Sequence, residues 1–161
     1  MLDFQGLYDE HSAPVHRFLQ HLSGDRSVAD DLTSETFVRL WLAPDKEGIQ
    51  SVRAYVMAIA RNLYLMHLRG TPRGAAGGDA LLGTLPDAGA DPERQAVDRD
   101  RLRSVQDRLA GLPEIDRAAL CLRAFEGLSY EEIAAALDIS VAAARVKVHR
   151  ARLRLGRAGK E

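Results

Sequence analysis

Residues 126–150 read EGLSYEEIAAALDISVAAARVKVHR, and this stretch decides the fold of the C-terminal part of the chain. Ser129 followed by Glu132 matches a capping box, in which two side chains bond the free backbone N–H groups at the start of a helix. The pattern predicts a short helix over 130–137, a tight turn at 138–140 and a basic helix over 141–155. These are the proportions of a helix-turn-helix.

The basic helix has two faces. Its predicted core face consists of Ala144, Val148, Ala151 and Leu155. At about 100° per residue, the opposite side would enter a major groove of DNA. The predicted DNA-facing residues are Ala142, Ala143, Arg145, Val146, Lys147, His149, Arg150, Arg152 and Arg154. Arg145 is close enough to the helix start to read a guanine edge, and the other basic residues are expected to contact phosphates. The alternative is a solvated basic helix that closes a small bundle.

Charge is distributed unevenly along the chain. Residues 140–161 contain seven basic side chains and one acidic side chain, a local charge of +6, although the net charge of the whole chain is only −1. The rest of the chain therefore carries −7. This asymmetry predicts a local phosphate-binding element on an otherwise acidic body.

The N-terminal part is also helical by its apolar spacing. An apolar stripe runs over 4–22, where Pro14 is expected to kink the helix or to start a second one. Ser27 with Asp30 then predicts an N-cap and a helix to about Trp41. After a turn-rich break at 43–48, a third helix is expected over 53–69, with a buried face of Val56, Ile59, Ala60 and Leu63.

Composition changes sharply between residues 70 and 90, where Gly, Pro, Ala and Asp dominate and no period is sustained. Asp91-Pro92-Glu93 then starts a helix, with leucines and Val105 as its apolar face. The break at Leu112-Pro113-Glu114 begins another helix that ends at Gly127. We therefore expect an all-α fold with two small helical domains, 1–69 and 91–161, joined by a flexible linker at 70–90.

Several function classes find no support. No apolar stretch is long enough to span a membrane, and the start lacks the basic residues of a secretion signal, so a cytoplasmic protein without membrane insertion is expected. Cys121 lies in an apolar run and is predicted to be a core residue. No catalytic motif, metal site or cofactor-binding loop is recognisable, so we expect no enzyme, no metal and no cofactor.

Five segments carry a family resemblance, which covers nearly the whole chain outside the linker. They are 30–41, 59–62, 112–117, 126–134 and 148–152. Together they resemble the extracytoplasmic-function (ECF, group IV) sigma factors of the sigma-70 family. Similar helix-turn-helix domains occur in response regulators, but those proteins lack the N-terminal segments.

The resemblance implies that the first domain binds core RNA polymerase and captures the minus-ten region of promoter DNA, while the second binds the minus-thirty-five element. The implied polymerase-binding residues are Asp31, Ser34, Glu35, Val38 and Arg39. Melting requires cationic and stacking side chains to hold an unstacked strand. The residues expected to supply them are Lys46, Arg53, Tyr55, Arg61 and Asn62. An anti-sigma protein is a further implied partner.

Other interpretations of these residues stay open. Tyr55 could pack in the core, Arg61 could pair with a surface acid, and Glu35 with Arg39 could form a simple intrahelical ion pair. Ser34, Met66 and Asp138 depart from the family pattern, as do Ala143, Ala144 and Lys147. The alternative function is a helix-turn-helix transcriptional regulator whose first domain is a protein-interaction module without sigma activity.

Overall fold

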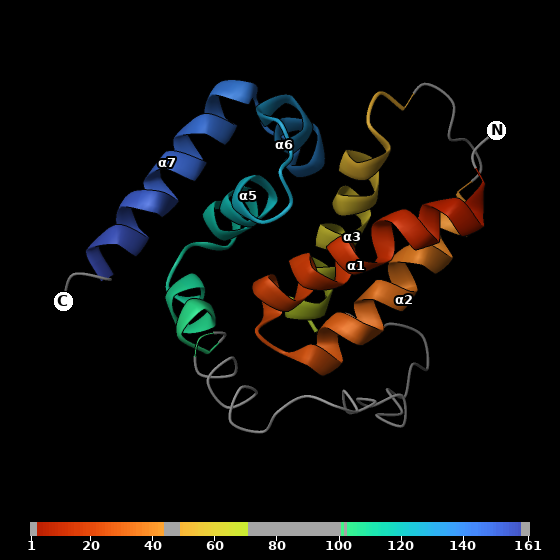
Figure 1. The fold of residues 1–161 in the computed structure, drawn as a ribbon, viewed down its shortest axis with the longest axis horizontal. Helices are drawn as coiled ribbons and strands as arrows, with labels where there is room; N and C mark the ends of the chain where they lie inside the picture. The colour runs from red at the N-terminus through yellow and green to blue at the C-terminus, as the bar shows by residue number, and fades with distance from the viewer. Residues whose placement is uncertain (1–2, 44–48, 71–100, 102, 159–161) are drawn as a thin grey trace.

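The chain folds into helices. The computed structural model describes residues 3–43, 49–70, 101 and 103–158, and every regular element within these ranges is helical (Figure 1). The elements are α1 (Phe4–Ser23), α2 (Arg26–Leu42), α3 (Val52–Leu68), a helical stretch at 103–110, α5 (Glu114–Ala124), α6 (Tyr130–Leu137) and α7 (Val141–Ala158). The all-α prediction is confirmed. The predicted linker beyond Gly70 and the predicted helix start at 91–93 lie outside the described residues.

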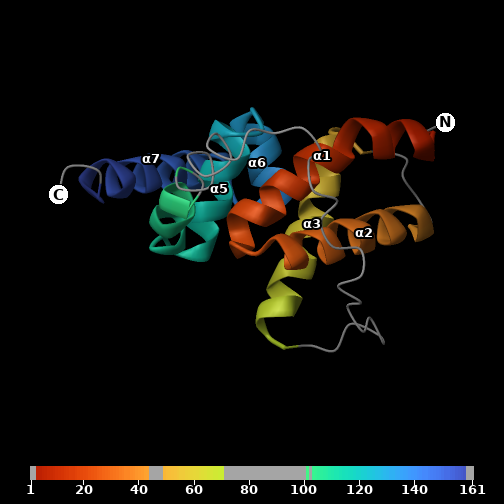
Figure 2. The ribbon, with the colours of Figure 1, turned by 60° about the horizontal axis from the view of Figure 1, so that its bottom comes forward.

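The helices form two lobes. In the N-lobe α1, α2 and α3 pack on one another, and in the C-lobe α5, α6 and α7 do the same. The stretch at 103–110 leads into α5 and is counted with the C-lobe. The lobes touch where α1 meets α5 and where α3 meets α6, as the two ribbon views show (Figure 2). Buried apolar side chains form one cluster that includes residues of both lobes. Burying one large apolar side chain contributes roughly 1.5–3 kcal/mol, so this cluster is the main source of stability.

Helix α1 is continuous, and the expectation that Pro14 starts a second helix is wrong. Asp3 caps the helix by accepting hydrogen bonds from the backbone N–H groups of Gln5 and Gly6, and Pro14 lies inside the element. An interior proline costs about 3 kcal/mol because it removes a backbone donor. The buried face of α1, which includes Phe18, offsets that cost by packing against α2 and α3.

Helix α2 begins two residues earlier than the capping pattern indicated. The side chain of Asp25, not Ser27, accepts hydrogen bonds from the N–H groups of Ser27 and Val28, at 2.8 and 3.3 Å. Gly24 ends α1 in the left-handed conformation at φ +69°, which lets the chain turn at once into the next helix. Helix α3 follows its prediction closely, with Val56, Ala60 and Leu63 buried.

The helix-turn-helix is confirmed. The capping box between Ser129 and Glu132 is complete, with both hydrogen bonds present. Asp138 takes the left-handed conformation at φ 56°, and Ser140 Oγ accepts from the N–H of Ala143 at 3.0 Å, which begins α7. The predicted core face of α7 is buried, with Leu155 only partly so. Val105, which the apolar spacing placed on the apolar face of a helix of this domain, is partly exposed.

Cys121 is fully buried, as predicted, and burial raises the pKa of its thiol to about 12. Alkylation requires the thiolate, which is scarce at pH 8 for such a group. We expect iodoacetamide to label the native protein at least about a hundredfold more slowly than the denatured protein. Mass spectrometry of timed samples measures both rates, and equal rates would contradict the burial of this side chain.

None of the helices in the described ranges is long and apolar enough to cross a membrane. Within the same ranges, no three His, Cys, Asp or Glu side chains come together as a metal site.

Candidate nucleic-acid interface

Helix α7 presents a basic face to solvent. The exposed members of the predicted DNA-facing set are Ala142, Arg145, Val146, His149, Arg150, Arg152 and Arg154, while Ala143 and Lys147 are half-buried. Because the buried residues of α7 pack on α5 and α6, this face points away from the C-lobe core. Small residues near the start of α7 leave room for close approach of a nucleic-acid groove.

Tyr130, at the start of α6, holds two arginines over its ring. The guanidinium carbon of Arg123 lies 4.5 Å from the ring centroid, and that of Arg145 lies 5.2 Å from it. Such cation–π contacts contribute about 0.5–1 kcal/mol at exposed sites. The contact restricts Arg145, the residue predicted to read a base, and this role of Tyr130 was not predicted. The partners lie on different helices, so helix periodicity alone could not reveal it.

Arg150 is tied to the C-lobe. Its Nε lies 3.5 Å from Oδ2 of Asp116, whose side chain is almost fully buried in α5. Arg150 therefore neutralises a buried acid, in addition to any phosphate contact it makes. Arg152 and Arg154 follow on the same helix and are exposed.

The predicted minus-ten residues that the structure describes all lie on α3. Asn62 is exposed and Tyr55 is half-buried against the core, while Lys46 falls outside the described residues. Arg53 and Arg61 are both engaged with carboxylates of the C-lobe. The four described residues therefore lie on one helix, and Arg53, Tyr55 and Arg61 lie beside the second lobe.

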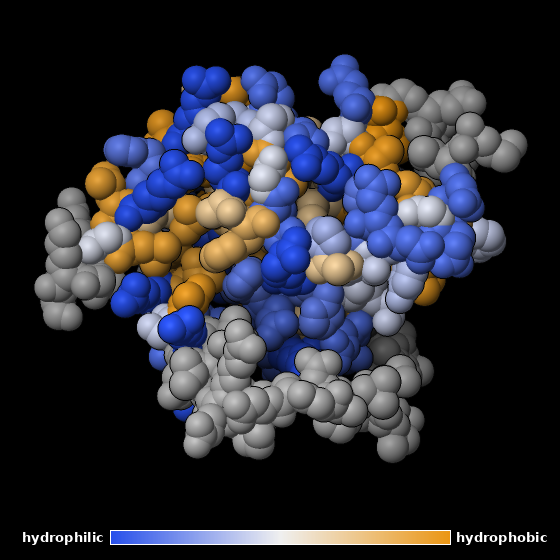
Figure 3. Space-filling view, in the orientation of Figure 1, coloured by the Kyte–Doolittle hydropathy of each residue, from blue (hydrophilic) through white to orange (hydrophobic). Residues whose placement is uncertain are grey.

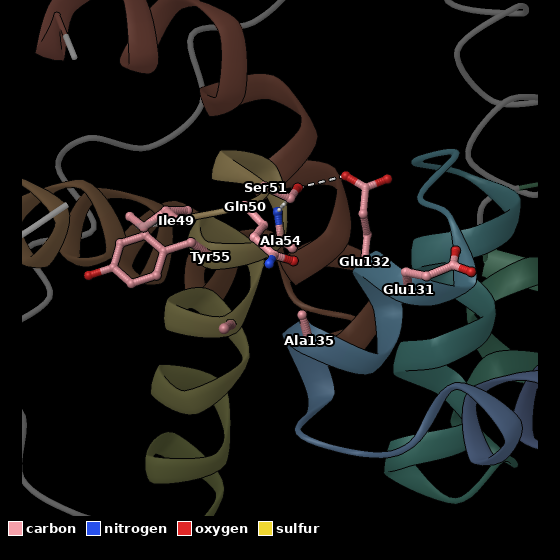
Figure 4. A pocket seen from close by; sticks show the side chains of 9 residues that line it. Ile49, Gln50, Ser51, Ala54, Tyr55, Glu131, Glu132 and Ala135 are labelled. Atoms are coloured by element: carbon pink, nitrogen blue, oxygen red, sulfur yellow. Dashed lines mark hydrogen bonds between the residues drawn. The ribbon is translucent and has the colours of Figure 1, made fainter. Parts of the chain in front are cut away.

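In the contact of Arg53 with the C-lobe, Glu132 accepts several side-chain hydrogen bonds. Its two carboxylate oxygens accept hydrogen bonds from Arg53 at 2.5 and 2.6 Å, and one also accepts from Ser51 Oγ at 2.7 Å (Figure 4). The same side chain accepts from the N–H of Ser129 at 3.0 Å to complete the cap of α6. The hydrogen bonds from Arg53, and then those from Ser129 and Ser51, hold the pKa of Glu132 well below its ordinary value.

Arg61 makes a second bidentate contact with a carboxylate. Its Nε and a terminal nitrogen donate to the two carboxylate oxygens of Glu114, at 2.9 and 2.8 Å. The side chains are only 12% and 19% exposed, respectively. The open interpretation that Arg61 pairs with an acid is therefore what the structure shows, although the acid belongs to the other lobe.

A pocket of about 480 Å³ lies between α3 and α6 beside these contacts. Tyr55, Ser51 and Ala54 line it from the α3 side, and Glu131, Glu132 and Ala135 line it from α6 (Figure 4). The aromatic ring predicted to capture a promoter base therefore borders a cleft whose opposite wall is the C-lobe.

On α2, the predicted polymerase-binding residues Asp31, Ser34, Val38 and Arg39 are exposed and Glu35 is half-buried. The ion pair of Glu35 with Arg39 is present at 3.3 Å, one helical turn apart. It occupies this surface without excluding a partner, because the side chain of Arg39 remains about half exposed. Exposed ion pairs of this kind contribute only about 0.3–0.5 kcal/mol.

An apolar groove adjoins this surface. It encloses about 490 Å³ and is lined by Phe4, Tyr8, Ser34, Phe37, Val38, Trp41 and Leu42. Trp41 is 61% exposed and its ring packs edge-on against Phe4, with centroids 4.7 Å apart. Large exposed apolar groups in one patch mark interaction sites. The site prediction omitted Trp41 and Leu42, although α2 carries more apolar residues than one buried stripe needs.

Two family models match successive parts of the chain. Sigma-70 region 2 matches residues 7–73, and Sigma-70, region 4 matches residues 102–155. The ECF RNA polymerase sigma factor SigL of Mycobacterium tuberculosis is 31% identical over 148 residues, covering 90% of this chain and 82% of SigL. This chain belongs to the ECF RNA polymerase sigma factors.

Other relatives agree with this assignment. The ECF RNA polymerase sigma factor SigE of Mycolicibacterium smegmatis is 33% identical over 96% of this chain, which spans 61% of the length of SigE. Among solved structures, the sigma factor RpoE in complex with the anti-sigma factor NepR from Bartonella quintana has a TM-score of 0.71 at 24% identity. That likeness covers 98% of this chain and 97% of the solved one, so the same fold extends over both lobes.

Proposed function

We propose that this ECF sigma factor binds core RNA polymerase through α2 and directs initiation at promoters read by both lobes. Helix α7 contacts the minus-thirty-five element, and α3 captures and melts the minus-ten region. The observation that carries the proposal is the exposed basic face of α7 in a capped helix-turn-helix, on the same chain as a region 2 match. Residues 1–69 and 91–161 are the two functional domains, and 70–90 is the linker.

The apolar groove beside α2 extends the polymerase-binding surface in this proposal. A few residues supply most of the binding energy at protein interfaces, and Trp, Tyr and Arg are enriched among them. An anti-sigma protein is a further proposed partner, since the solved relative RpoE is in complex with one. The protein acts in the cytoplasm and needs no cofactor.

Run-off transcription tests the proposal directly. The purified chain is mixed with sigma-free core polymerase and a library of promoter fragments from its own genome. We expect transcripts with defined starts that share two upstream sequence elements. A helix-turn-helix regulator without sigma activity would bind duplex DNA alone and yield no transcript, and that result would overturn the proposal.

Arg145 and Arg152 should differ in their effects on promoter binding. Arg145→Ala is expected to reduce discrimination at one base pair by about 1–3 kcal/mol, or roughly 5- to 150-fold, because a guanidinium can satisfy both acceptors of a guanine. Arg152→Ala is expected to weaken all sequences alike and to reduce the slope of log affinity against log salt by about 0.9. Holoenzyme binding to a set of single-base promoter variants, repeated at several salt concentrations, measures both quantities.

Arg108→Ala is the matched control, since Arg108 is an exposed arginine of the C-lobe outside α7. It should leave discrimination unchanged. Equal losses of discrimination for Arg145→Ala and Arg152→Ala would show that the two roles are assigned wrongly.

A further inference from the structure

Within the part of the chain that the structure describes, three arginine–carboxylate pairs join the lobes, and in each the arginine belongs to the N-lobe and the carboxylate to the C-lobe. We call them the inter-lobe pairs: Arg17 with Glu126, Arg53 with Glu132, and Arg61 with Glu114. All three pairs are bidentate. Their shortest nitrogen–oxygen distances are, in the same order, 2.6, 2.5 and 2.8 Å. Hydrophilic side chains cover the middle of the face where α1 lies beside α5 (Figure 3). Charge complementarity therefore holds the lobes in one arrangement.

Other contacts reinforce the same arrangement. The ring of His21 stacks on Phe125 with centroids 4.2 Å apart, and Arg117 donates to the carbonyl oxygen of Leu22 at 2.5 Å. Gln106 donates to the carbonyl oxygen of Gln20 at 3.3 Å. Each of these contacts also joins the N-lobe to the C-lobe. We call the surface over which the lobes touch the seam, and the arrangement with all these contacts formed the closed state.

Two inter-lobe pairs engage the arginines that the proposed function assigns to promoter DNA. A guanidinium that donates two hydrogen bonds to a carboxylate cannot offer the same two-pronged geometry to a phosphate. Arg61 is also largely buried by the C-lobe, and α6 forms the far wall of the pocket beside Tyr55. A DNA phosphate therefore cannot make bidentate contacts with Arg53 or Arg61 while the lobes are closed.

We infer that the inter-lobe pairs form an autoinhibitory contact, in which Glu114 and Glu132 occupy Arg61 and Arg53 in place of promoter phosphates until the lobes separate. This inference rests on the proposed function for its biological meaning. The exposed residues of α2 take no part in the inter-lobe pairs, so polymerase can dock before the lobes open. In the closed state Arg53 and Arg61 are not available to DNA. They become available when promoter phosphates replace Glu132 and Glu114 as their partners.

The burial of the charges makes the contact sensitive to single substitutions. Glu126 is only 2% exposed and Arg61 only 12%. Removing one partner of such a pair leaves an uncompensated charge in a desolvated site, which disfavours the closed state more than the pair itself stabilises it. The orphaned charge regains water when the lobes separate, so each such substitution should open the molecule.

The first test variant is the full chain with Glu114→Gln and Glu132→Gln. Glutamine is accepted at the fourth position of a capping box, so α6 keeps its cap while the charge facing Arg53 is lost. The control is Asp107→Asn with Asp138→Asn, which removes two exposed acids that do not line the inter-lobe pocket and produces the same change in net charge. Asparagine tolerates the left-handed conformation that Asp138 adopts.

The second test variant is Arg17→Gln, which removes the N-lobe partner of one inter-lobe pair. It leaves the buried Glu126 carboxylate without its arginine and lowers the positive charge of the chain by one. Tighter DNA binding by this variant cannot come from added positive charge. Far-UV circular dichroism verifies that every variant retains the helical content of the wild type.

Two measurements follow on each protein without polymerase. Small-angle X-ray scattering gives the radius of gyration, and fluorescence anisotropy gives the affinity for a random-sequence single-stranded DNA oligonucleotide at several salt concentrations. We expect both test variants to be more expanded than the wild type and to bind about tenfold more tightly at low salt, as for a binding-competent state that is about 10% populated in the wild type. In Glu114→Gln with Glu132→Gln, two additional phosphate contacts should steepen the salt slope by about 1.4 relative to the control.

Unchanged radii in both test variants would overturn the inference, because the pairs would then not hold the lobes together. Expansion with unchanged DNA affinity would also overturn it, because the contact would then not be inhibitory. Neither measurement requires transcription. Failure of the run-off assay would therefore count against the proposed function alone, while the scattering and anisotropy results would still decide whether the seam hides a DNA-binding face.

Discussion

Phe18→Ala should lower the free energy of unfolding by about 3–5 kcal/mol, the range for removing a large aromatic ring from a packed core. Phe18 is fully buried on α1, between the neighbouring buried residues Val15 and Leu22. The loss combines the transfer free energy of the ring with the cost of the cavity that remains. Urea denaturation followed by far-UV circular dichroism measures the change.

Tyr8→Ala is the control for that prediction. Tyr8 is an aromatic residue of the same helix, but it is exposed and contacts Phe37 edge-on with centroids 5.0 Å apart. Loss of one such contact should cost about 1 kcal/mol. If both substitutions destabilised the protein equally, the buried face of α1 would be assigned to the wrong side of the helix.

Trp41→Ala should weaken binding to core RNA polymerase by at least about 30-fold, or about 2 kcal/mol, the lower limit for an interface hot spot. Trp41 is largely exposed at the end of α2 and forms one wall of the apolar groove. A partner that fills the groove buries this ring on both sides. Titration of labelled protein with core polymerase, in the absence of DNA, measures the affinity.

Leu68→Ala separates this effect from a general loss of apolar surface. Leu68 is 57% exposed, similar to Trp41, but lies at the end of α3, away from the groove. Its replacement should leave polymerase affinity within about twofold of the wild type, since most exposed substitutions have effects within about 0.5 kcal/mol. Equal affinity of Trp41→Ala and the wild type would exclude the groove from the polymerase interface.

The features that could be predicted from sequence are those decided by residues a few positions apart. The capping box from Ser129 to Glu132 and the buried face of α7 both follow from local spacing, and both are present. The error at the start of α2 also has a local origin. Asp25 and Ser27 are both good N-cap residues, and the left-handed Gly24 decides between them.

The inter-lobe pairs could not be predicted in the same way. Arg53 and Arg61 meet acids that are 79 and 53 positions away along the chain. The sequence contains 23 acidic residues, and no local pattern selects Glu132 and Glu114 among them. Only the packing of α3 against α6, and of α1 against α5, brings these partners together. The roles assigned to α3 in DNA binding stay predictions.

The polymerase-binding role of the residues on α2 stays a prediction. The motif at 30–41 placed a binding surface on the helix, and the predicted residues that are exposed lie on its solvent side. The groove itself depends on Phe4 and Tyr8 of α1, which pack across the end of α2. A motif on one helix cannot indicate a cavity whose second wall comes from another.

The carboxylate of Glu132 both caps α6 and binds Arg53. The contact between the lobes and the formation of α6 therefore use separate hydrogen bonds of the same side chain. When Arg53 departs, Glu132 still accepts from the backbone of Ser129, and the helix that precedes α7 stays intact. Separation of the lobes, as inferred above, therefore needs no melting of α6. Domain motions take microseconds to milliseconds, so under that inference the lobes can close again within this time after Arg53 and Arg61 leave the DNA.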